Sequence, residues 1–539
     1  MTPIEMTERL NLSMDENIET FKLCILAAGR GTRNTSIVGL HKALLPLENR
    51  PVISHILDKF PENIEVIIPV GYRSDQIKSY LNYVYSKKNI KFIDIDNFDG
   101  MGSGPGYSLL QCKDHLQCPF VFTSADTVLG DDDFIDSVIE NWVGVSKIDR
   151  DLSSSYCLTK GSGTLDDFYY GKGDTAFIGI AGVKDYQNFW NSLENNVIIK
   201  NEKQVIHGFD NLENIKLKLL GWYDTGNNES YELARKKFKN EVVANKSSEA
   251  IFIDNECVVK YFDDENKSSL RLERSKFIKD TCPEITKLNS NMFGYSFIKG
   301  EMLSNLRSER YFYSFLDFFN ENFLSKRFKK DDLFLKDCAS MYQDKTRERM
   351  KYFSGTSLDN IRNINGVCVD TIENIFSKID WDLIYKKSIP SYFHGDLQPE
   401  NIIYDISNER FLTIDWRESF GKSISIGDAY YDLGKLYHGL VINGQTILKG
   451  NYFISESGDT ASIEFPIRSN LFSQLVVLRE FCENNNICWL NVRLAGVLNF
   501  INISPLYQNF DGGKYGRFLF LLGKLLLTRI IKNKPGELI

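Results

Sequence analysis

The sequence predicts two domains of different class. The first is an α/β domain with a doubly wound, mostly parallel sheet, and the second is an α+β domain. Three observations support this. The chain has 539 residues, more than one hydrophobic core usually serves. Up to about residue 235, apolar strands alternate with helical segments, which is typical of a parallel sheet. From residue 250 onward, paired strands are followed by long helical stretches.

Composition excludes several other classes of protein. With 42% hydrophobic and 25% charged residues and a net charge of −8, the chain has a globular composition and no basic tail, which argues against general nucleic-acid binding. Residues 1–20 are acidic and lack an apolar core, so we expect an N-terminal extension and no signal peptide. The apolar run 518–531 is interrupted by Lys524 and Arg529, so we expect a packing helix and no membrane span.

The ten cysteines include no CxxC pair, so neither a zinc site nor a disulfide framework is predicted. Reduced thiols are typical of the cytoplasm. We therefore expect a soluble, cytoplasmic protein; a homo-oligomer is compatible with the sequence, which leaves the oligomeric state open.

The first predicted strand, residues 21–28, runs directly into a glycine-rich turn. Gly29, Gly31, Thr32 and Arg33 follow it, and Lys42 lies nine residues beyond Arg33. Closely spaced glycines after a buried strand let backbone N–H groups approach a phosphate, because no Cβ stands in the way. Arg33 and Lys42 would supply the countercharge. This pattern indicates a nucleotide-phosphate site.

The alternation continues with strands at 65–72, 91–95, 120–122 and 175–183 and helices from Asp75 and Tyr107. A turn that contains Gly102 and Ser103 opens the helix at Tyr107, and Asp126 follows the strand at 120–122. Ligands are expected at the carboxyl ends of such strands.

This half resembles the nucleotidyltransferases of the nucleotide-sugar pyrophosphorylase type, with a LAAGxGTR loop, a Lys before LLP and an aromatic-Asp-Thr-Gly segment at 223–226. The resemblance implies a GT-A-like fold in which the loop and Arg33 hold the NTP triphosphate, Lys42 steadies pyrophosphate, and the turn at Gly102 and Ser103 contacts the base. It also implies that Asp126 and Asp224 bind Mg²⁺.

The first half departs from this family in two places. His41 stands where a Pro usually precedes the Lys, which is expected to loosen the backbone at Lys42. The usual Glu-Lys-Pro segment is absent, and Lys172 is the candidate to replace its Lys at the sugar phosphate; a solvated loop Lys is the alternative.

After a polar stretch at 229–248, interpreted as an inter-domain helix or linker, a strand pair resumes at 250–262 with Lys260 in its second strand. A helix containing Glu273 follows, and residues 293–303 are expected to form another strand and a hinge. Helical, aromatic-rich sequence fills 304–385.

The richest chemical motif lies at 392–416, YFHGDLQPENIIYDISNERFLTIDW. We expect a loop with Asp396, a short strand after Asn401, a polar turn, and a second strand that leads to Asp415. Such a hairpin presents all three side chains at one end. One carboxylate that orients a hydroxyl, with an Asn and a second carboxylate for Mg²⁺, is what phosphoryl transfer from ATP requires.

The motif resembles the aminoglycoside phosphotransferase and choline kinase family, which has His-Gly-Asp, an Asn five residues later and an Ile-Asp-aromatic strand. The resemblance implies a two-lobed, protein-kinase-like α+β domain with Asp396 as base and Asn401 and Asp415 as metal ligands. Lys260 would grip the ATP phosphates with Glu273 as its ion-pair partner, and Asp428 and Asp432 would brace the catalytic loop.

Arg417 bears on the acceptor of this second reaction. A guanidinium beside the metal Asp disfavours a quaternary ammonium and favours hydroxyl-rich or anionic acceptors. Pairing of Arg417 with Glu418 or Asp432 is the alternative.

We therefore predict an N-terminal extension (1–20), a nucleotidyltransferase domain (21–235), a linker and kinase small lobe (236–303) and a kinase large lobe (304–539). The function predicted is phosphorylation of a small sugar or polyol with ATP, followed by transfer of a nucleoside monophosphate from CTP or UTP, giving an NDP-activated precursor for surface polysaccharide. The partners would be small molecules and nucleotides, with no nucleic acid or membrane. Two alternatives remain: a choline or amino-alcohol kinase joined to a cytidylyltransferase, and a chain with one inactive, regulatory half.

Overall fold

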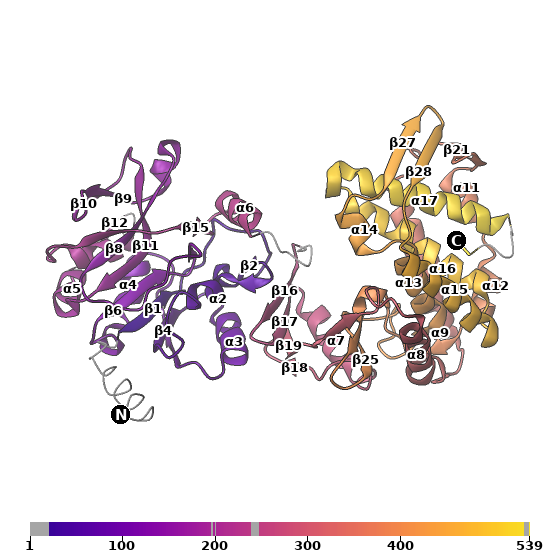
Figure 1. Ribbon diagram of the computed structural model, residues 1–539, viewed down its shortest axis with the longest axis horizontal. Coiled ribbons are helices and arrows are strands. Elements are labelled where there is room, and N and C mark those ends of the chain that lie inside the picture. Colours follow the sequence, from indigo (N-terminus) through magenta and orange to yellow (C-terminus); the bar gives the residue numbers. More distant parts are fainter. Residues whose placement is uncertain (1–20, 196–197, 200, 239–246, 533–537) are drawn as a thin grey trace, which may run out of the picture. The chain divides into compact units, whose positions relative to one another are not determined.

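The chain divides into two compact units. A computed structural model describes residues 21–195, 198–199, 201–238, 247–532 and 538–539 (Figure 1); the predicted extension 1–20 lies outside them. The first unit comprises Met1–Glu265 and Thr286–Tyr295, and the second comprises Asn266–Ile285 and Ser296–Ile539. This division differs from the predicted boundary at residue 235, because strands after residue 248 pack with the first unit.

The first unit is built on a sheet that, among the described residues, contains nine strands. β1 (Lys22–Leu26) lies between β4 (Val66–Val70) and β6 (Phe120–Ser124) and is parallel to both, and β5 (Ile90–Asp94) is parallel to β4. β11 (Thr175–Val183) runs antiparallel to β6.

Beyond β11 the sheet is mixed. β11 pairs antiparallel with β8 (Trp142–Lys147) and β9 (Leu158–Gly161), β9 pairs antiparallel with β10 (Leu165–Tyr169), and β14 (Lys216–Leu219) lies parallel to β8. The prediction of a mostly parallel sheet is therefore wrong for this part. Short connections between β9, β10 and β11 leave no room for the helical crossovers that parallel neighbours need.

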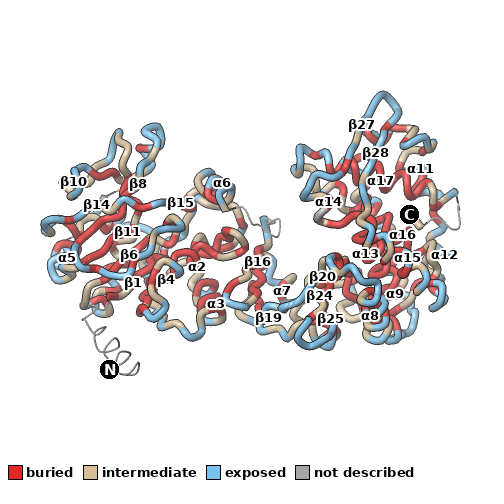
Figure 2. The backbone as a smooth tube through the Cα atoms, viewed as in Figure 1, coloured by how far each residue is buried: buried red, intermediate tan, exposed pale blue. Residues whose placement is uncertain are grey.

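Side chains of the central strands alternate between two apolar layers. Leu23 and Ile25 of β1 lie in one layer, and Cys24 and Leu26 lie in the other. Helices α2 (Val52–Leu57) and α3 (Ser74–Val84) contribute to the first layer, and α4 (Pro105–Leu110) and α5 (Tyr186–Leu193) contribute to the second. The strands are consequently buried on both faces (Figure 2), as a doubly wound sheet requires.

A second, four-stranded sheet belongs to the same unit. Its order is β16 (Glu249–Asp254), β17 (Cys257–Phe262), β19 (Met292–Ser296) and β18 (Thr286–Lys287). Asp254 ends β16 and is buried; its carboxylate accepts hydrogen bonds from Arg50 Nε (2.9 Å), Tyr80 Oη (3.0 Å) and Tyr85 Oη (2.8 Å). Phe252 and Val259 also join the apolar core of the large sheet.

The remaining described elements of the first unit are short: β2 (Pro46–Leu47), β3 (Arg50–Pro51), β7 (Thr127–Leu129), β12 (Ile198–Ile199), β13 (Glu202–Lys203), β15 (Trp222–Asp224) and α6 (Asn228–Lys237).

The second unit is largely helical. Every residue of α13 (Ala429–Val441) is buried, and α13 packs on α16 (Trp489–Ile503) through two glycines. A Cβ on Gly434 would lie 2.6 Å from Ala495 Cβ, and a Cβ on Gly496 would lie 2.9 Å from Gly434 O. Only glycine permits this close approach of α13 to α16.

The hairpin predicted at 402–414 is formed by β24 (Ile402–Asp405) and β25 (Arg410–Thr413), and β20 (Gly300–Met302) pairs with β24. The other elements are α7 (Glu265–Ser275), α8 (Glu309–Phe319), α9 (Asp332–Ala339), α10 (Lys345–Met350), α11 (Ile372–Ser377), α12 (Trp381–Lys387), α14 (Gly444–Leu448), α15 (Ser469–Asn484), α17 (Lys514–Ile531), β21 (Asn363–Ile364), β22 (Val367–Cys368), β23 (Pro390–Ser391), β26 (Gly427–Asp428), β27 (Phe453–Ser457) and β28 (Thr460–Glu464).

The apolar run near the C-terminus forms α17, and its Lys524 is fully buried. Lys524 Nζ donates to the carbonyl oxygens of Asp359 (2.6 Å) and Ile361 (2.8 Å). Of the helices that the structure describes, none has both the length and the apolar character needed to cross a membrane.

Candidate active sites

A cavity of about 640 Å³ lies in the first unit, where β1 ends. It is lined by seven of the residues expected to hold a nucleotide: Gly29, Gly31, Thr32, Arg33, Lys42, Ser103 and Asp126. Gly102 is not among the lining residues; its N–H donates to Asn201 O at 2.8 Å. The cavity wall also includes Phe98, Asp99, Asn201, Glu202 and Gln204, which come from segments whose sequences contain no recognisable motif.

Gly31 is the position of the glycine-rich turn where a side chain would interfere. Its φ is +61°, and a Cβ there would lie 2.8 Å from Lys42 Cδ. A Cβ added to Gly29 would meet no other atom within 4 Å. The turn thus uses Gly31 to bring its backbone close to Lys42.

His41 replaces the expected proline without loosening the backbone. Its φ is −66°, close to the value that a proline ring imposes. The ring Nδ1 accepts a hydrogen bond from Ala43 N (3.1 Å), and the backbone N–H donates to Gln76 Oε1 (2.9 Å). Burial lowers the pKa of His41 to about 3 and keeps the ring neutral. The expected loosening at Lys42 is therefore wrong, because the buried imidazole holds the turn.

Lys42 and Asp126 form an ion pair across the cavity. Lys42 Nζ lies 2.8 Å from Asp126 Oδ2. Burial alone would raise the pKa of Asp126, but the charges of Lys42 and Arg33 outweigh it and hold the pKa below its usual value. The carboxylate is ionised and available to a cation.

Asp224 is brought to Asp126 by strand pairing. β15 pairs antiparallel with β7, so that Asp224 faces Thr127, and Thr225 N and Oγ1 both donate to Asp126 O at 3.0 Å. Tyr156 Oη donates to Asp224 Oδ2 at 3.0 Å. No sequence signal identified Tyr156.

The two carboxylates share one space. A Cβ added to Gly226 would lie 3.1 Å from Asp224 Oδ1 and 3.3 Å from Asp126 Oδ2. Within the described residues, no group of three or more His, Cys, Asp or Glu is placed to hold a metal. Two carboxylates that face one space, with phosphates and water as further ligands, are the oxygen donors that Mg²⁺ prefers. This donor set therefore fits the ion.

Lys172 does not join this site. It lies exposed before β11 and is not among the residues that line the cavity. Arg30, which the sequence analysis did not select, pairs with Asp99 at 2.9 Å on the cavity wall.

In the second unit, the hairpin brings Asp396, Asn401 and Asp415 to one end. Ile414 N donates to Asn401 O at 2.9 Å, which extends the β24–β25 ladder. Asn401 Nδ2 donates to Asp396 O at 2.8 Å. Asp415 has a φ of +62°, a conformation that Asp tolerates better than most residues. The amide oxygen of Asn401 and the carboxylate of Asp415 are again hard oxygen donors and fit Mg²⁺.

Asp396 is held through one of its two oxygens. Gln398 Nε2 donates to Oδ1 at 3.0 Å, and Lys435 Nζ lies 3.0 Å from the same atom. Burial opposes ionisation of Asp396, but the charge of Lys435 outweighs it and holds the pKa well below the usual value. Among the described residues, Oδ2 has no hydrogen-bond partner.

Asp432 supports the loop that carries His394, Gly395 and Asp396. Its carboxylate accepts hydrogen bonds from His394 N and Gly395 N, each at 2.6 Å. Burial raises the pKa of Asp432 to about 7. Gly395 has a φ of +87°, and a Cβ there would lie 2.6 Å from Arg417 Cβ, so the loop requires glycine.

Asp428 supports the strand that leads into this loop. It accepts hydrogen bonds from Ile389 N (2.8 Å) and Tyr342 Oη (2.9 Å). Asp428 and Asp432 therefore make scaffold contacts of the kind that the sequence analysis expected.

Lys260 and Glu273 lie in different units. Lys260 is buried in β17 of the first unit, and Glu273 is exposed on α7 of the second. Arg271, on the same helix, faces the hairpin: its Nη1 lies 3.9 Å from Asp415 Oδ1, and its Nε lies 3.7 Å from Glu418 Oε2. Sequence reasoning selected Glu273 and missed Arg271.

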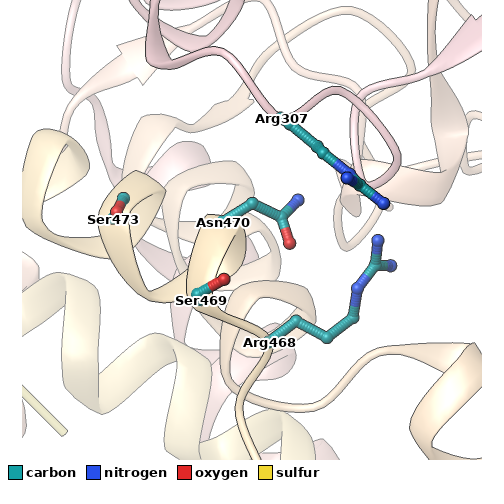
Figure 3. Close-up of a pocket in the computed structure, with 5 residues that line it drawn as sticks. All are labelled: Arg307, Arg468, Ser469, Asn470 and Ser473. Atoms are coloured by element: carbon teal, nitrogen blue, oxygen red, sulfur yellow. The ribbon is translucent and has the colours of Figure 1, made fainter.

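A further pocket, of about 500 Å³, lies between the segment before α8 and the start of α15. The guanidinium groups of Arg307 and Arg468 point toward one another across it (Figure 3). Asn470 Nδ2 ties the two walls by donating to Ser304 O at 3.2 Å. The described residues that line this pocket include no carboxylate.

Comparison with known proteins bears on the first unit. Residues 23–149 match the profile of the MobA-like NTP transferase domain. The bifunctional protein GlmU of Methanococcus vannielii is 30% identical over 128 residues, which cover 23% of this chain and 29% of that protein. GlmU of Enterococcus faecalis is 44% identical over 59 residues, or 11% and 12% of the two chains. The chain therefore spans less than a third of the length of these curated relatives.

Solved structures also overlap part of the chain. A UDP-glucose pyrophosphorylase complexed with UDP-glucose has 17% sequence identity and a TM-score of 0.33, covering 41% of this chain and 98% of that one. The CTP:phosphocholine cytidylyltransferase LicC of Streptococcus pneumoniae has 18% identity and a TM-score of 0.33, covering 41% and 100%. The glycine-rich turn, Lys42 and Asp126 all lie within residues 23–149, the stretch that matches the profile of the MobA-like NTP transferase domain.

Proposed function

We propose that the first unit is a nucleotidyltransferase that joins a nucleoside monophosphate to the phosphate of a small acceptor and releases pyrophosphate. The observation that carries this proposal is the shared space between Asp126 and Asp224 beside Lys42, at the mouth of a cavity lined by the glycine-rich turn. Backbone N–H groups of the turn and the side chain of Arg33 would hold the triphosphate. Lys42, released from Asp126, would stabilise the negative charge that develops on pyrophosphate.

Asp126 and Asp224 would hold Mg²⁺ in this unit. The ion, when bound, offsets the repulsion between the phosphate of the acceptor and the α-phosphate of the NTP. Tyr156 keeps Asp224 oriented toward the shared space by donating to its other oxygen.

For the second unit we propose phosphorylation of a small hydroxylated molecule with ATP. The observation that carries this proposal is the convergence of Asp396, Asn401 and Asp415 at one end of the β24–β25 hairpin. Asp396 Oδ2 would take the proton of the acceptor hydroxyl as its oxygen attacks the γ-phosphorus. Asn401 and Asp415 would hold Mg²⁺, which neutralises phosphate charge when bound.

The proposed roles of Lys260 and Glu273 remain those implied by the family resemblance: Lys260 as the contact to the ATP phosphates and Glu273 as its orienting partner. The exposure of Glu273 and the contact of Arg271 with Asp415 favour Arg271 as the residue of α7 that acts at the hairpin.

In combination the two activities would produce an NDP-activated sugar or polyol, a suitable precursor for surface polysaccharide, with CTP or UTP as the second nucleotide. A choline or amino-alcohol kinase with a cytidylyltransferase is the second candidate. The local cations disfavour it, because Lys435, which pairs with Asp396, and Lys345 and Arg417, which lie near Tyr431, would repel a quaternary ammonium. An inactive, regulatory half is disfavoured by the intact carboxylates of both sites.

Two single substitutions test the scheme. Asp396→Ala should stop ADP formation and leave pyrophosphate release from a supplied phospho-acceptor unchanged, and Asp126→Ala should do the reverse. Mass spectrometry after addition of each NTP in turn would identify the product and the base. If either substitution left both activities intact, the two-site scheme would be wrong.

A further inference from the structure

We propose that the acceptor phosphorylated by the second unit carries a carboxylate or phosphate group next to the hydroxyl that reacts, and that Lys345 and Arg417 bind this group with help from Tyr431. The inference rests on the proposed kinase function of this unit and names the chemical class of its substrate.

Cationic side chains from separate elements converge beside the catalytic base. Lys345 begins α10, Arg417 follows the hairpin, and Lys435 lies on α13. Lys345 Nζ lies 3.3 Å from Tyr431 Oη, and Tyr431 is fully buried one turn before Lys435 on α13. Lys435 Nζ in turn lies 3.0 Å from Asp396. Three separate segments thus place cations near Tyr431.

The carboxylates in contact with this group do not balance it. Asp396 is the partner of Lys435. Glu418 lies 3.8 Å from Arg417 Nη2 but is shared with Arg271, whose Nε lies 3.7 Å away. Among the described residues, the hydrogen-bond partner of Lys345 is the neutral hydroxyl of Tyr431. Lys345 therefore supplies the positive charge that is least compensated.

The pKa of Tyr431 also indicates that its surroundings are positively charged. Burial would raise the pKa of its phenol, but the charges of Lys345, Arg417 and Lys435 outweigh burial and lower the pKa to about 8. A site that favours a phenolate also favours a carboxylate or phosphate brought by a ligand.

ATP offers a competing explanation for part of this charge. Lys435, which touches Asp396, could serve the γ-phosphate, whereas Lys345 and Arg417 reach Tyr431 on the side of α13. The two explanations differ in which Michaelis constant responds. If Lys345 and Arg417 serve the acceptor, their removal raises KM for the acceptor and leaves KM for ATP unchanged.

The experiment measures ADP formation by the full-length protein with matched acceptors. Each neutral polyol is paired with an anionic counterpart, for example glycerol with glycerate and with glycerol 3-phosphate, or ribitol with ribitol 5-phosphate; choline is the cationic arm. We expect kcat/KM for the anionic member to exceed that for its neutral partner by tenfold or more. Comparison of glycerate with glycerol 3-phosphate shows whether the site prefers a carboxylate or a phosphate.

Variants then assign the effect to residues. Lys345→Gln and Arg417→Gln should each raise KM for the anionic acceptor about tenfold to a hundredfold, as expected for loss of a charge-assisted hydrogen bond. KM for ATP should not change. Arg417→Lys should restore part of the loss, and Lys351→Gln, an exposed lysine just after α10, is the matched control.

The possible outcomes separate the two proposals. If the folded, full-length wild-type protein formed no ADP with any acceptor, the proposed kinase function would be wrong, and this inference with it. ADP formation that favours neutral acceptors or choline, or that is indifferent to Lys345→Gln and Arg417→Gln, would overturn the inference and leave the kinase function standing. A rise in KM for ATP alone would assign these cations to the nucleotide.

Discussion

Lys42 Nζ lies 2.8 Å from Asp126 Oδ2 in the first unit, and the buried, neutral imidazole of His41 on one side of Lys42 accepts a hydrogen bond from Ala43 N on the other. Lys42 is thus paired with Asp126, which is also a proposed metal ligand. Binding of Mg²⁺ and NTP would replace this ion pair and free Lys42 for the phosphates.

Replacement of Lys42 by Ala should lower the rate of pyrophosphate release about 10²–10³-fold. The substitution removes a positive charge that is already in place to stabilise the negative charge developing on pyrophosphate. ADP formation should be unchanged. Stopped-flow detection of pyrophosphate is the measurement, and Lys87→Ala, an exposed lysine away from the cavity, is the control. Equal losses in both variants would contradict the assigned role.

Gly226→Ala should weaken the response of the first unit to Mg²⁺. The new methyl group would stand 3.1 Å from Asp224 Oδ1 and 3.3 Å from Asp126 Oδ2, in the space assigned to the ion. We expect the Mg²⁺ concentration at half-maximal pyrophosphate release to rise about tenfold, equivalent to roughly 1.4 kcal/mol. Gly444→Ala, where a Cβ meets nothing within 4 Å, is the control; a wild-type Mg²⁺ titration for Gly226→Ala would place the ion elsewhere.

Lys435→Gln should move the acidic limb of the kinase pH profile to higher pH. Asp396 must be ionised to accept a proton, and the charge of Lys435 is what outweighs burial and holds its pKa low. Without that charge the pKa of Asp396 rises, so activity at mildly acidic pH is lost first. The profile of kcat/KM against pH is the measurement. Lys435→Arg should keep the wild-type profile, and an unshifted profile for Lys435→Gln would show that Lys435 does not tune the base.

Asp254→Asn should destabilise the first unit by on the order of 3 kcal/mol at pH 7, because Arg50 loses a buried carboxylate partner. Burial opposes ionisation of Asp254, but its hydrogen bonds and Arg50 lower its pKa from 3.8. The carboxylate of Asp254 therefore binds a proton less readily in the folded state than in the unfolded chain. The stabilisation is present above about pH 4 and is lost as the pH falls below it.

Thermal unfolding at pH 7 and pH 3 tests this prediction. The difference between wild type and Asp254→Asn should shrink at the lower pH. Asp58→Asn is the matched control, since Asp58 pairs with the same Arg50 but is exposed, and exposed pairs contribute about 0–1 kcal/mol. A constant difference at both pH values would show that the charge of Asp254 is not the stabilising feature.

Local patterns predicted several strands well. The strand expected at 175–183 is β11 with the same bounds, and the hairpin that leads to Asp415 lies where its two apolar runs and polar turn indicate. These features depend on a few adjacent residues, so a single sequence contains the information. The site roles assigned to them stay predictions until activity is measured.

Long-range contacts were not predictable in the same way. Tyr156 reaches Asp224 from 68 residues away, and Asp254 is bonded by Tyr80, 174 residues earlier. Lys435 is one of many lysines, and only the packing of α13 places it at Asp396. Such pairings depend on tertiary packing, which no local motif encodes.

The chain also crosses between its units more than once. It leaves the first unit after Glu265, returns for Thr286–Tyr295, and then leaves again. The returning segment contributes Met292 to the apolar core of the first unit, and β16 and β17 contribute Phe252 and Val259. No single cut of the chain therefore separates the two units. Splitting the gene near residue 235 would leave the upstream product with an uncovered apolar surface that is prone to aggregate, so the two units are inherited, and lost, as one chain.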